Sequence, residues 1–415
     1  MGVIETRQLQ CGMTLIVETM SGVRSAGLTW LLPNGCACDP LEKQGLAAIW
    51  SEIVMRGAGT RDSRAHADAL DRLGVSRSTE ARTFTFRIGA SMLGERLSES
   101  FELITDMVLK PRMDGASVEP CRDLALQNLA SLADEPQDRA VYAARERHHP
   151  DPLSRSGLGT PEGLKAVTEA DLRDIWAKYA RPKSSVIAIA GAVDASDIEH
   201  RLNDLLGDWS GEAPKFSTGP APVRGYGHLN DESNQVQIIL LHDAPTEKDP
   251  DSLLEKVVMM VLSGGMAGRL FTEVREKRGL CYSVNAGYAG DRDFGIASAY
   301  VGTTPERAQQ SLDVLYEQLQ FIMTPAGRIT DEEFARAIVG MKSSLVFSGE
   351  SSGARAASLA ADYRRLGRPR SLDELAAEID ALTPGIVNDY LARRRMGRWT
   401  IQTLGPAPLT PPANC

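Results

Sequence analysis

The residues best suited to chemistry lie in one segment, GGMAGRLFTEVREKRGLCYSV, at positions 264–284. Arg275 ends an apparent helix in this segment, and Tyr282, seven positions later, begins a strand. A guanidinium and a phenol hydroxyl both donate hydrogen bonds, so each can bind an oxygen acceptor. A structural interpretation stays open, because Arg275 also complements a helix dipole, Gly279 is a natural helix stop and a strand tyrosine usually packs.

The histidines and cysteines predict no metal site or disulfide framework. His66 lies in a polar helical stretch, His148 and His149 precede a proline, and the other three histidines are isolated, so we predict surface or loop histidines. Cys36 and Cys38 form a C-x-C pair, but no second pair follows at the spacing of a zinc finger. We therefore predict that this pair marks a strand end or a turn. Six cysteines spread over 415 residues are also unlike a disulfide scaffold.

Composition limits the classes of partner. A chain of 415 residues suits two domains of about 200 residues each. The net charge is −9 and no long run of lysine or arginine is present, which argues against nucleic-acid binding. No apolar run approaches the roughly 18 to 20 residues needed to cross a bilayer, and the N-terminal residues do not resemble a signal peptide. We therefore expect a cytoplasmic protein without a membrane partner.

Hydrophobic periodicity supplies the elements that must position Arg275 and Tyr282. Both halves of the chain show an apolar strand, a helix and a further strand in the same order. In the first half these are strands at 14–18 and 26–32, a helix at 44–56 and a strand at 82–88; in the second half they are a strand at 236–241, a helix at 253–262 and a strand at 296–301.

The two halves also match each other directly. When Arg96 is set on Arg307, the apolar positions of 91–108 fall opposite those of 302–319. Long helices follow in both halves, near 118–134 and 331–347. The stretch 207–232 is rich in Gly, Pro and Ser and predicts an interdomain linker. We therefore predict an α+β fold of two homologous domains, residues 1–215 and 216–415, each a sheet packed by helices.

Several strings in colinear order resemble one peptidase family. The segment at 264–284, together with SGLGTPEGLKAVTEADLRDIWAKYARPKSSVIAIAGAVD at 156–194, resembles the insulinase-like (M16) family of inverted zincins, and in detail its short bacterial type. The resemblance runs from about residue 8 to residue 400. It implies that each domain contains a mostly antiparallel sheet and that the chain forms half of a clamshell chamber.

The same resemblance implies that the metal site of the family is lost here. Catalytic members carry H-x-x-E-H on a helix, where two imidazoles hold zinc and the glutamate activates the bound water. Matching GLAAIWSEIVMRG to this pattern puts Ala48 and Glu52 at the imidazole positions and Ser51 at the base. The downstream ligand position falls on Asn128. We therefore expect no metal in this chain, and a structural role for the motif helix.

Arg275 and Tyr282 match the residues with which the zinc-lacking domain of the family holds its substrate and donates to the scissile carbonyl and to the oxyanion that develops from it. The resemblance therefore implies a zinc-free subunit of a heterodimeric metallopeptidase, inactive alone. Its partner would be a homologous chain that bears H-x-x-E-H and the zinc, and its substrate an unfolded peptide. Two alternatives stay open: a structural subunit like the core proteins of the cytochrome bc1 complex, and a peptide-binding pseudoenzyme without a proteolytic role that pairs with itself.

Overall fold

The computed structural model describes residues 2–413 and separates into two compact units. Unit 1 comprises the chain up to Ser131 together with Arg155–Thr218 and Phe347–Ser371. Unit 2 comprises Leu132–Ser154, Gly219–Val346 and the chain from Leu372 onward. The main division therefore lies three residues after the predicted one at 215/216. Two short segments cross over: Leu132–Ser154, from the first half of the chain, belongs to unit 2, and Phe347–Ser371, from the second half, belongs to unit 1.

Unit 1 is built on a six-stranded sheet in the order β1-β2-β8-β3-β7-β6. Neighbouring strands are antiparallel except β2 and β8, which run parallel. The strands are β1 (Ile4–Gln8), β2 (Thr14–Thr19), β3 (Ser25–Leu32), β6 (Ser76–Ala81), β7 (Phe86–Leu93) and β8 (Val186–Gly191), with a separate ladder of β4 (Gly57–Ala58) and β5 (Arg61–Asp62). The helices are α1 (Leu46–Ile53), α2 (Ser63–Arg72), α3 (Leu97–Leu109), α4 (Gly115–Ser131), α6 (Pro161–Ala166), α7 (Glu169–Tyr179), α8 (Ala195–Leu206) and α12 (Ser352–Leu366).

Unit 2 is built on a five-stranded sheet in the order β11-β12-β10-β13-β9. Here the single parallel pair is β13 with β9. The strands are β9 (Gly225–Asn230), β10 (Val236–Asp243), β11 (Cys281–Gly290), β12 (Gly295–Thr303) and β13 (Thr400–Gly405). The helices are α5 (Pro136–His148), α9 (Ser252–Ser263), α10 (Ala308–Phe321), most of α11 (Asp331–Gly349), α13 (Leu372–Asp380) and α14 (Pro384–Arg393).

The two sheets repeat one topology, which confirms the predicted α+β fold with mostly antiparallel sheets. Reading from one edge, β6-β7-β3-β8-β2 of unit 1 corresponds to β11-β12-β10-β13-β9 of unit 2, with the parallel pair at the same place. The predicted helix match is also confirmed in register. Leu97 begins α3 and Ala308 begins α10, each directly after a 3-10 turn that ends at Arg96 or Arg307.

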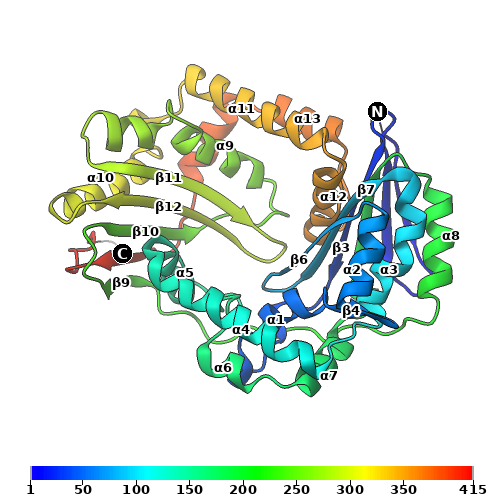
Figure 1. Ribbon diagram of the computed structural model, residues 1–415. Helices are drawn as coiled ribbons and strands as arrows, with labels where there is room; N and C mark the ends of the chain where they lie inside the picture. The colour runs from blue at the N-terminus through cyan, green and yellow to red at the C-terminus, as the bar shows by residue number, and fades with distance from the viewer. Residues whose placement is uncertain (1, 414–415) are drawn as a thin grey trace. The chain divides into compact units, whose positions relative to one another are not determined.

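Each sheet receives one helix from the other half of the sequence. The helix α12 packs on β3 and β8 of unit 1, while α5 packs on the equivalent strands β10 and β13 of unit 2, as Figure 1 shows for both helices. These helices bury the second face of each sheet. In β2, for example, Leu15 and Val17 face the large core of unit 1, and Ile16 packs with Leu359 of α12. This two-sided burial explains why these strands are apolar at consecutive positions.

Two local predictions need correction. The strand predicted at 82–88 begins only at Phe86, because residues 82–85 form the turn of the β6–β7 hairpin, closed by a hydrogen bond from the Arg82 amide to the Thr85 carbonyl. The alternation of apolar and polar residues continues into this turn, because the turn residue Phe84 is apolar and packs against Phe216, with ring centres 5.6 Å apart.

The predicted linker 207–232 is also too long, because it contains the edge strand β9. The sequence shows no hydrophobic pattern for β9, because polar contacts help to hold this strand on β13. The hydroxyl of Tyr226 and Nδ1 of His228 each lie 2.9 Å from the hydroxyl oxygen of Thr403. Across residues 2–413, no helix is long and apolar enough to cross a membrane.

Candidate functional site

The helix at the degenerate zinc motif, α1, is fully formed. Its N-terminus begins at Gly45, whose φ of 109° lies in the left-handed region. The buried carboxylate of Asp39 accepts hydrogen bonds from the amides of Gly45, at 2.8 Å, and Ala47, at 3.1 Å. Burial raises the pKa of Asp39 to about 7. At the other side, Trp50 donates to the carbonyl of Leu172 and packs edge-on against Trp176. The helix is therefore held in the core of unit 1.

The three motif positions on α1 carry only one strong metal-ligating side chain. Ala48, Ser51 and Glu52 lie on its half-exposed face, while Ile49 and Ile53 are buried. The hydroxyl of Ser51 donates to the carbonyl of Ala47 within the helix. Glu52 is the only one of the three with a side chain that can ligate zinc well, because Ala48 has no donor atom and a serine hydroxyl is a weak ligand.

The fourth motif position, Asn128, is exposed on α4, which packs beside α1. On the same helix, burial raises the pKa of Cys121 to about 11, with Arg56 opposing and Glu52 adding to the shift. The structure thus brings the two motif helices together as the family pattern requires. One carboxylate, one hydroxyl and one amide do not fit a zinc site, however. Nowhere in residues 2–413 do three His, Cys, Asp or Glu side chains gather as a metal site.

Arg275 and Tyr282 meet in unit 2. The guanidinium carbon of Arg275 lies 5.2 Å from the centre of the Tyr282 ring and 4.6 Å from the centre of the Phe271 ring. Phe271 and Arg275 share the π-helical segment Phe271–Glu276, where four residues of separation place them on one face. The cation is therefore held by two aromatic rings, an arrangement that contributes on the order of 1 kcal/mol per ring.

A β-bulge turns Tyr282 outward. Cys281 pairs with Thr303 and Ser283 pairs with Gly302, so Tyr282 is the extra residue on β11. Bulges re-aim a side chain in this way, and Tyr282 is 84% exposed. The turn before it is fixed, because Arg307 donates to the carbonyl of Gly279, and Thr303 donates to the carbonyl of Leu280 at 2.6 Å.

The nearby charges leave Arg275 unpaired. Glu273 forms ion pairs with Lys277, at 2.6 Å, and with Arg278, at 2.7 Å, and these hydrogen bonds lower the pKa of Glu273. In the described part of the chain, no acceptor forms a hydrogen bond with the guanidinium of Arg275 or the hydroxyl of Tyr282. Both groups can therefore donate to an oxygen atom of a ligand, and the guanidinium can do so with two N–H groups in one plane.

A second arginine anchors the start of this segment. Arg269 forms a two-point ion pair with Glu333 of α11, at 2.6 and 2.7 Å, and also donates to the carbonyl of Gly327. Burial opposes ionisation of Glu333, yet Arg269 and the Thr330 amide hold its pKa at about 2. The segment that carries Arg275 is thereby fixed to α11.

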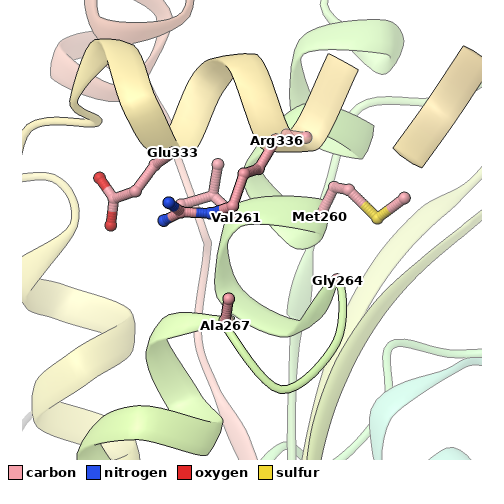
Figure 2. A pocket seen from close by; sticks show the side chains of 8 residues that line it. Met260, Val261, Gly264, Ala267, Glu333 and Arg336 are labelled. Atoms are coloured by element: carbon pink, nitrogen blue, oxygen red, sulfur yellow. The ribbon is translucent and has the colours of Figure 1, made fainter. Parts of the chain in front are cut away.

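The loop before this segment contains Gly264 and Gly265, and neither position accommodates a larger residue without strain. Gly265 has a φ of 124°, and a Cβ atom at Gly264 would lie 2.3 Å from the carbonyl oxygen of Met260. The loop, α9 and α11 line a small pocket. Figure 2 shows the Arg336 side chain reaching from α11 toward Val261 of α9 in this pocket.

The sequence interpretation missed Phe271 and the pair of Arg269 with Glu333. Phe271 carried a signal, since an aromatic residue four positions before an arginine shares its helix face. The pair of Arg269 and Glu333 carried none, because 64 residues separate its members.

The prediction of surface or loop histidines was wrong for three of the six, because His66, His148 and His242 are buried in helices or a strand. His149 lies in the loop that follows α5 and is buried as well. Burial lowers the pKa of His149 and of His242 to about 3. These histidines are core residues: His66, for example, lies 3.1 Å from the carbonyl oxygen of Leu103. The cysteine pair does form a turn, the buried 3-10 segment Cys36–Cys38.

Comparison with known proteins shows a similarity to M16 peptidases. A family model described as the peptidase M16 inactive domain matches residues 166–341. The chain is 26% identical over 409 residues to a protein of Streptomyces coelicolor described as an uncharacterized zinc protease, covering 95% of this chain and 88% of that protein. The chain therefore resembles M16 peptidases over most of its length. The match to an inactive domain fits a non-catalytic member of that family.

Solved structures share the fold of the whole chain. A peptidase M16 inactive domain from Pseudomonas fluorescens superposes with a TM-score of 0.86 at 21% identity, covering 99% of both chains. A protease from Helicobacter pylori superposes with a TM-score of 0.85 at 16% identity, covering 98% of this chain and all of that one.

Proposed function

We propose that this chain is the zinc-free subunit of a two-chain metallopeptidase. Its partner on this proposal is a homologous chain of similar size that carries H-x-x-E-H and the zinc. When bound in the partner, zinc polarises the scissile carbonyl and activates the attacking water. The present chain forms half of the enclosing chamber and presents Arg275 and Tyr282 to an unfolded peptide substrate.

The observation that carries this proposal is the state of Arg275. Its guanidinium lies close to the rings of Phe271 and Tyr282, yet no acceptor binds it within residues 2–413. An arginine kept only for structure is expected to pair with a carboxylate or a carbonyl, as Arg269 does with Glu333 and Gly327. A donor pair without an internal acceptor fits a site whose acceptor arrives with the substrate.

The chemistry expected of these donors is stabilisation of negative charge on oxygen. As water attacks a peptide carbonyl, charge develops on its oxygen, and a guanidinium or phenol donor within hydrogen-bond distance stabilises that charge. Removing one such donor typically costs a factor of about 100 to 1,000 in turnover. The four altered positions of α1 and α4 explain why this chain needs a partner to complete the reaction.

The test is hydrolysis of an unstructured fluorogenic peptide by three samples: this chain, the H-x-x-E-H chain, and their mixture, with zinc counted in each. The proposal predicts hydrolysis and one zinc per pair only in the mixture. A stable mixed complex without hydrolysis would instead favour a structural subunit. Zinc-dependent hydrolysis by this chain alone would contradict the interpretation of Ala48, Ser51, Glu52 and Asn128.

A further inference from the structure

The free edge of β11 begins at the candidate site. β11 spans ten residues, Cys281–Gly290, and is the outermost strand of its sheet. It pairs with β12 on one side, and no other strand of the described chain pairs with its second side. Such an edge presents unpaired N–H and C=O groups, which an extended peptide can complete as an added strand.

The side chains of β11 favour a peptide of almost any sequence. Val284, Ala286 and Tyr288 pack against the core of unit 2. Because side chains alternate along a strand, the residues between them face the opposite way, and these are the small or polar Asn285, Gly287 and Ala289. With no large side chain to select residues on that face, affinity would come from the main chain and from the end of the peptide.

Arg275 and Tyr282 lie at the N-terminal end of this edge. A strand added antiparallel to β11 runs in the opposite direction, so its C-terminal end lies beside Cys281 and Tyr282. The guanidinium carbon of Arg275 lies 5.2 Å from the centre of the Tyr282 ring, which places the guanidinium beside the second residue of the strand. The positive charge at this end of the edge complements a negatively charged peptide terminus.

Hydrolysis creates such a terminus. Water adds to the scissile carbonyl carbon, the C–N bond breaks, the amine leaves with a proton, and the former carbonyl carbon becomes a carboxylate. A neutral carbonyl can accept one or two hydrogen bonds from Arg275, whereas a carboxylate offers two oxygens in the plane that matches a guanidinium. The donors that hold the substrate carbonyl should therefore hold the product carboxylate more tightly.

We infer that β11 and Arg275 form a product-retention site. It holds the N-terminal fragment of a cut peptide as an antiparallel strand, with the new carboxylate on Arg275 and Tyr282. This inference rests on the proposed function, because it takes Arg275 and Tyr282 to be the substrate-holding donors. It makes peptides with a free C-terminus inhibitors of the assembled enzyme, with little dependence on their sequence.

The test measures binding of two labelled peptides to the full chain without a partner. Both are the same unstructured decapeptide without acidic residues, labelled with fluorescein at the N-terminus; one ends in a carboxylate and the other in an amide. Fluorescence anisotropy should show at least about tenfold tighter binding of the acid, as expected for a charge-assisted hydrogen bond. Equal affinity, or no binding of either peptide at about 1 mM, the weak end of measurable affinities, would overturn the inference.

Matched variants assign the preference to Arg275. Arg275→Gln should reduce the affinity for the acid to that for the amide, while Arg278→Gln should keep the preference, because Arg278 is paired with Glu273. Circular dichroism checks that both variants fold, and Tyr282→Phe offers a second, exposed change that should weaken binding of the acid severalfold. Retention of the full preference by folded Arg275→Gln would contradict the carboxylate site.

A second measurement tests the strand. N-methylation of one peptide bond at a time removes single N–H donors from the acid peptide. Addition to an edge predicts that binding weakens at every second position only, because alternate N–H groups face the protein. Equal sensitivity at all positions, or at none, would contradict strand addition.

The two proposals can fail separately. If the folded chain prefers the acid peptide but the mixed chains hydrolyse nothing, β11 and Arg275 stand as a binding site for peptide C-termini and the split peptidase fails. If the mixed chains hydrolyse the peptide and the acid is not preferred, the split peptidase stands and product retention fails.

Discussion

The guanidinium carbon of Arg275 lies 5.2 Å from the centre of the Tyr282 ring and 4.6 Å from the centre of the Phe271 ring. Two donors that are seven residues apart in sequence thus form one unit at the start of β11. The aromatic rings fix the cation without using its N–H groups. A carboxylate partner such as Glu333 of Arg269 would fix the group equally well but would occupy those N–H groups.

Replacing Arg275 should reduce turnover in the assembled pair. We expect Arg275→Ala to lower the hydrolysis rate at least about tenfold with zinc content unchanged, because the change removes a charged donor and leaves the partner's metal site intact. Initial-rate assays with the fluorogenic peptide measure the effect. Arg278→Ala is the matched control, since it removes a neighbouring charge that pairs with Glu273, and should leave the rate within about twofold. Wild-type turnover from the Arg275 variant would remove its role.

Replacing Tyr282 by Phe separates the phenol hydroxyl from the ring. The ring that contacts Arg275 stays, and the hydroxyl has no acceptor in the described chain, so the free energy of unfolding should change by less than about 0.5 kcal/mol. Turnover of the pair should nevertheless fall, because one donor to the substrate oxygen is lost. Thermal unfolding and initial rates, measured on the same sample, check both parts. A loss of stability that accounts for the loss of rate would indicate a packing role instead.

Local patterns were sufficient to predict the elements whose stability depends on near neighbours. The apolar spacing at 44–56 predicted α1, and the match of Arg96 with Arg307 placed the starts of α3 and α10 correctly. The bulge at Tyr282 could not be predicted in this way, because it exists only in the pairing of β11 with β12. The sequence also did not predict that α5 packs on the sheet of unit 2 and α12 on the sheet of unit 1. Consecutive apolar residues in β2 indicate that both faces are covered, but not which helix covers the second face.

The family resemblance, rather than periodicity, supplied Ala48, Ser51, Glu52 and Asn128 as motif positions. The structure places three of them on one helix and the fourth on the helix beside it. Whether they would hold zinc if the ligand types were restored is therefore a direct test of that placement.

Restoring the four side chains should create a zinc site. We expect the combined variant Ala48→His, Ser51→Glu, Glu52→His and Asn128→Glu to bind one zinc per chain, because α1 and α4 already pack together. Metal analysis after gel filtration measures the stoichiometry. The same variant with Asn128 retained is the control and should bind zinc more weakly, since it has one ligand fewer. A folded four-site variant without zinc would show that the helices do not lie at ligand distance.

The ion pair of Arg269 with Glu333 should make stability depend on pH in the acid range. The pKa of Glu333 is about 2 in the folded chain against an ordinary 4.5, so its stabilisation is complete above pH 4.5 and is lost as the pH falls toward 2. Glu333→Gln should therefore be less stable than wild type at about pH 7, and the difference should narrow between pH 4.5 and 2. Urea unfolding at several pH values measures it. Glu332→Gln alters only an exposed pair with Arg336, so its difference from wild type should be small throughout.

The measurement that tests the central claim most directly is a titration of activity. The H-x-x-E-H chain is held at a fixed concentration well above the dissociation constant of the pair, and the present chain is added in steps while peptide hydrolysis and bound zinc are recorded. The account predicts that the rate rises from near zero and saturates at one chain per partner, with zinc constant, and that Arg275→Ala saturates at the same ratio with a rate at least about tenfold lower. A rate that does not depend on the added chain would contradict the account.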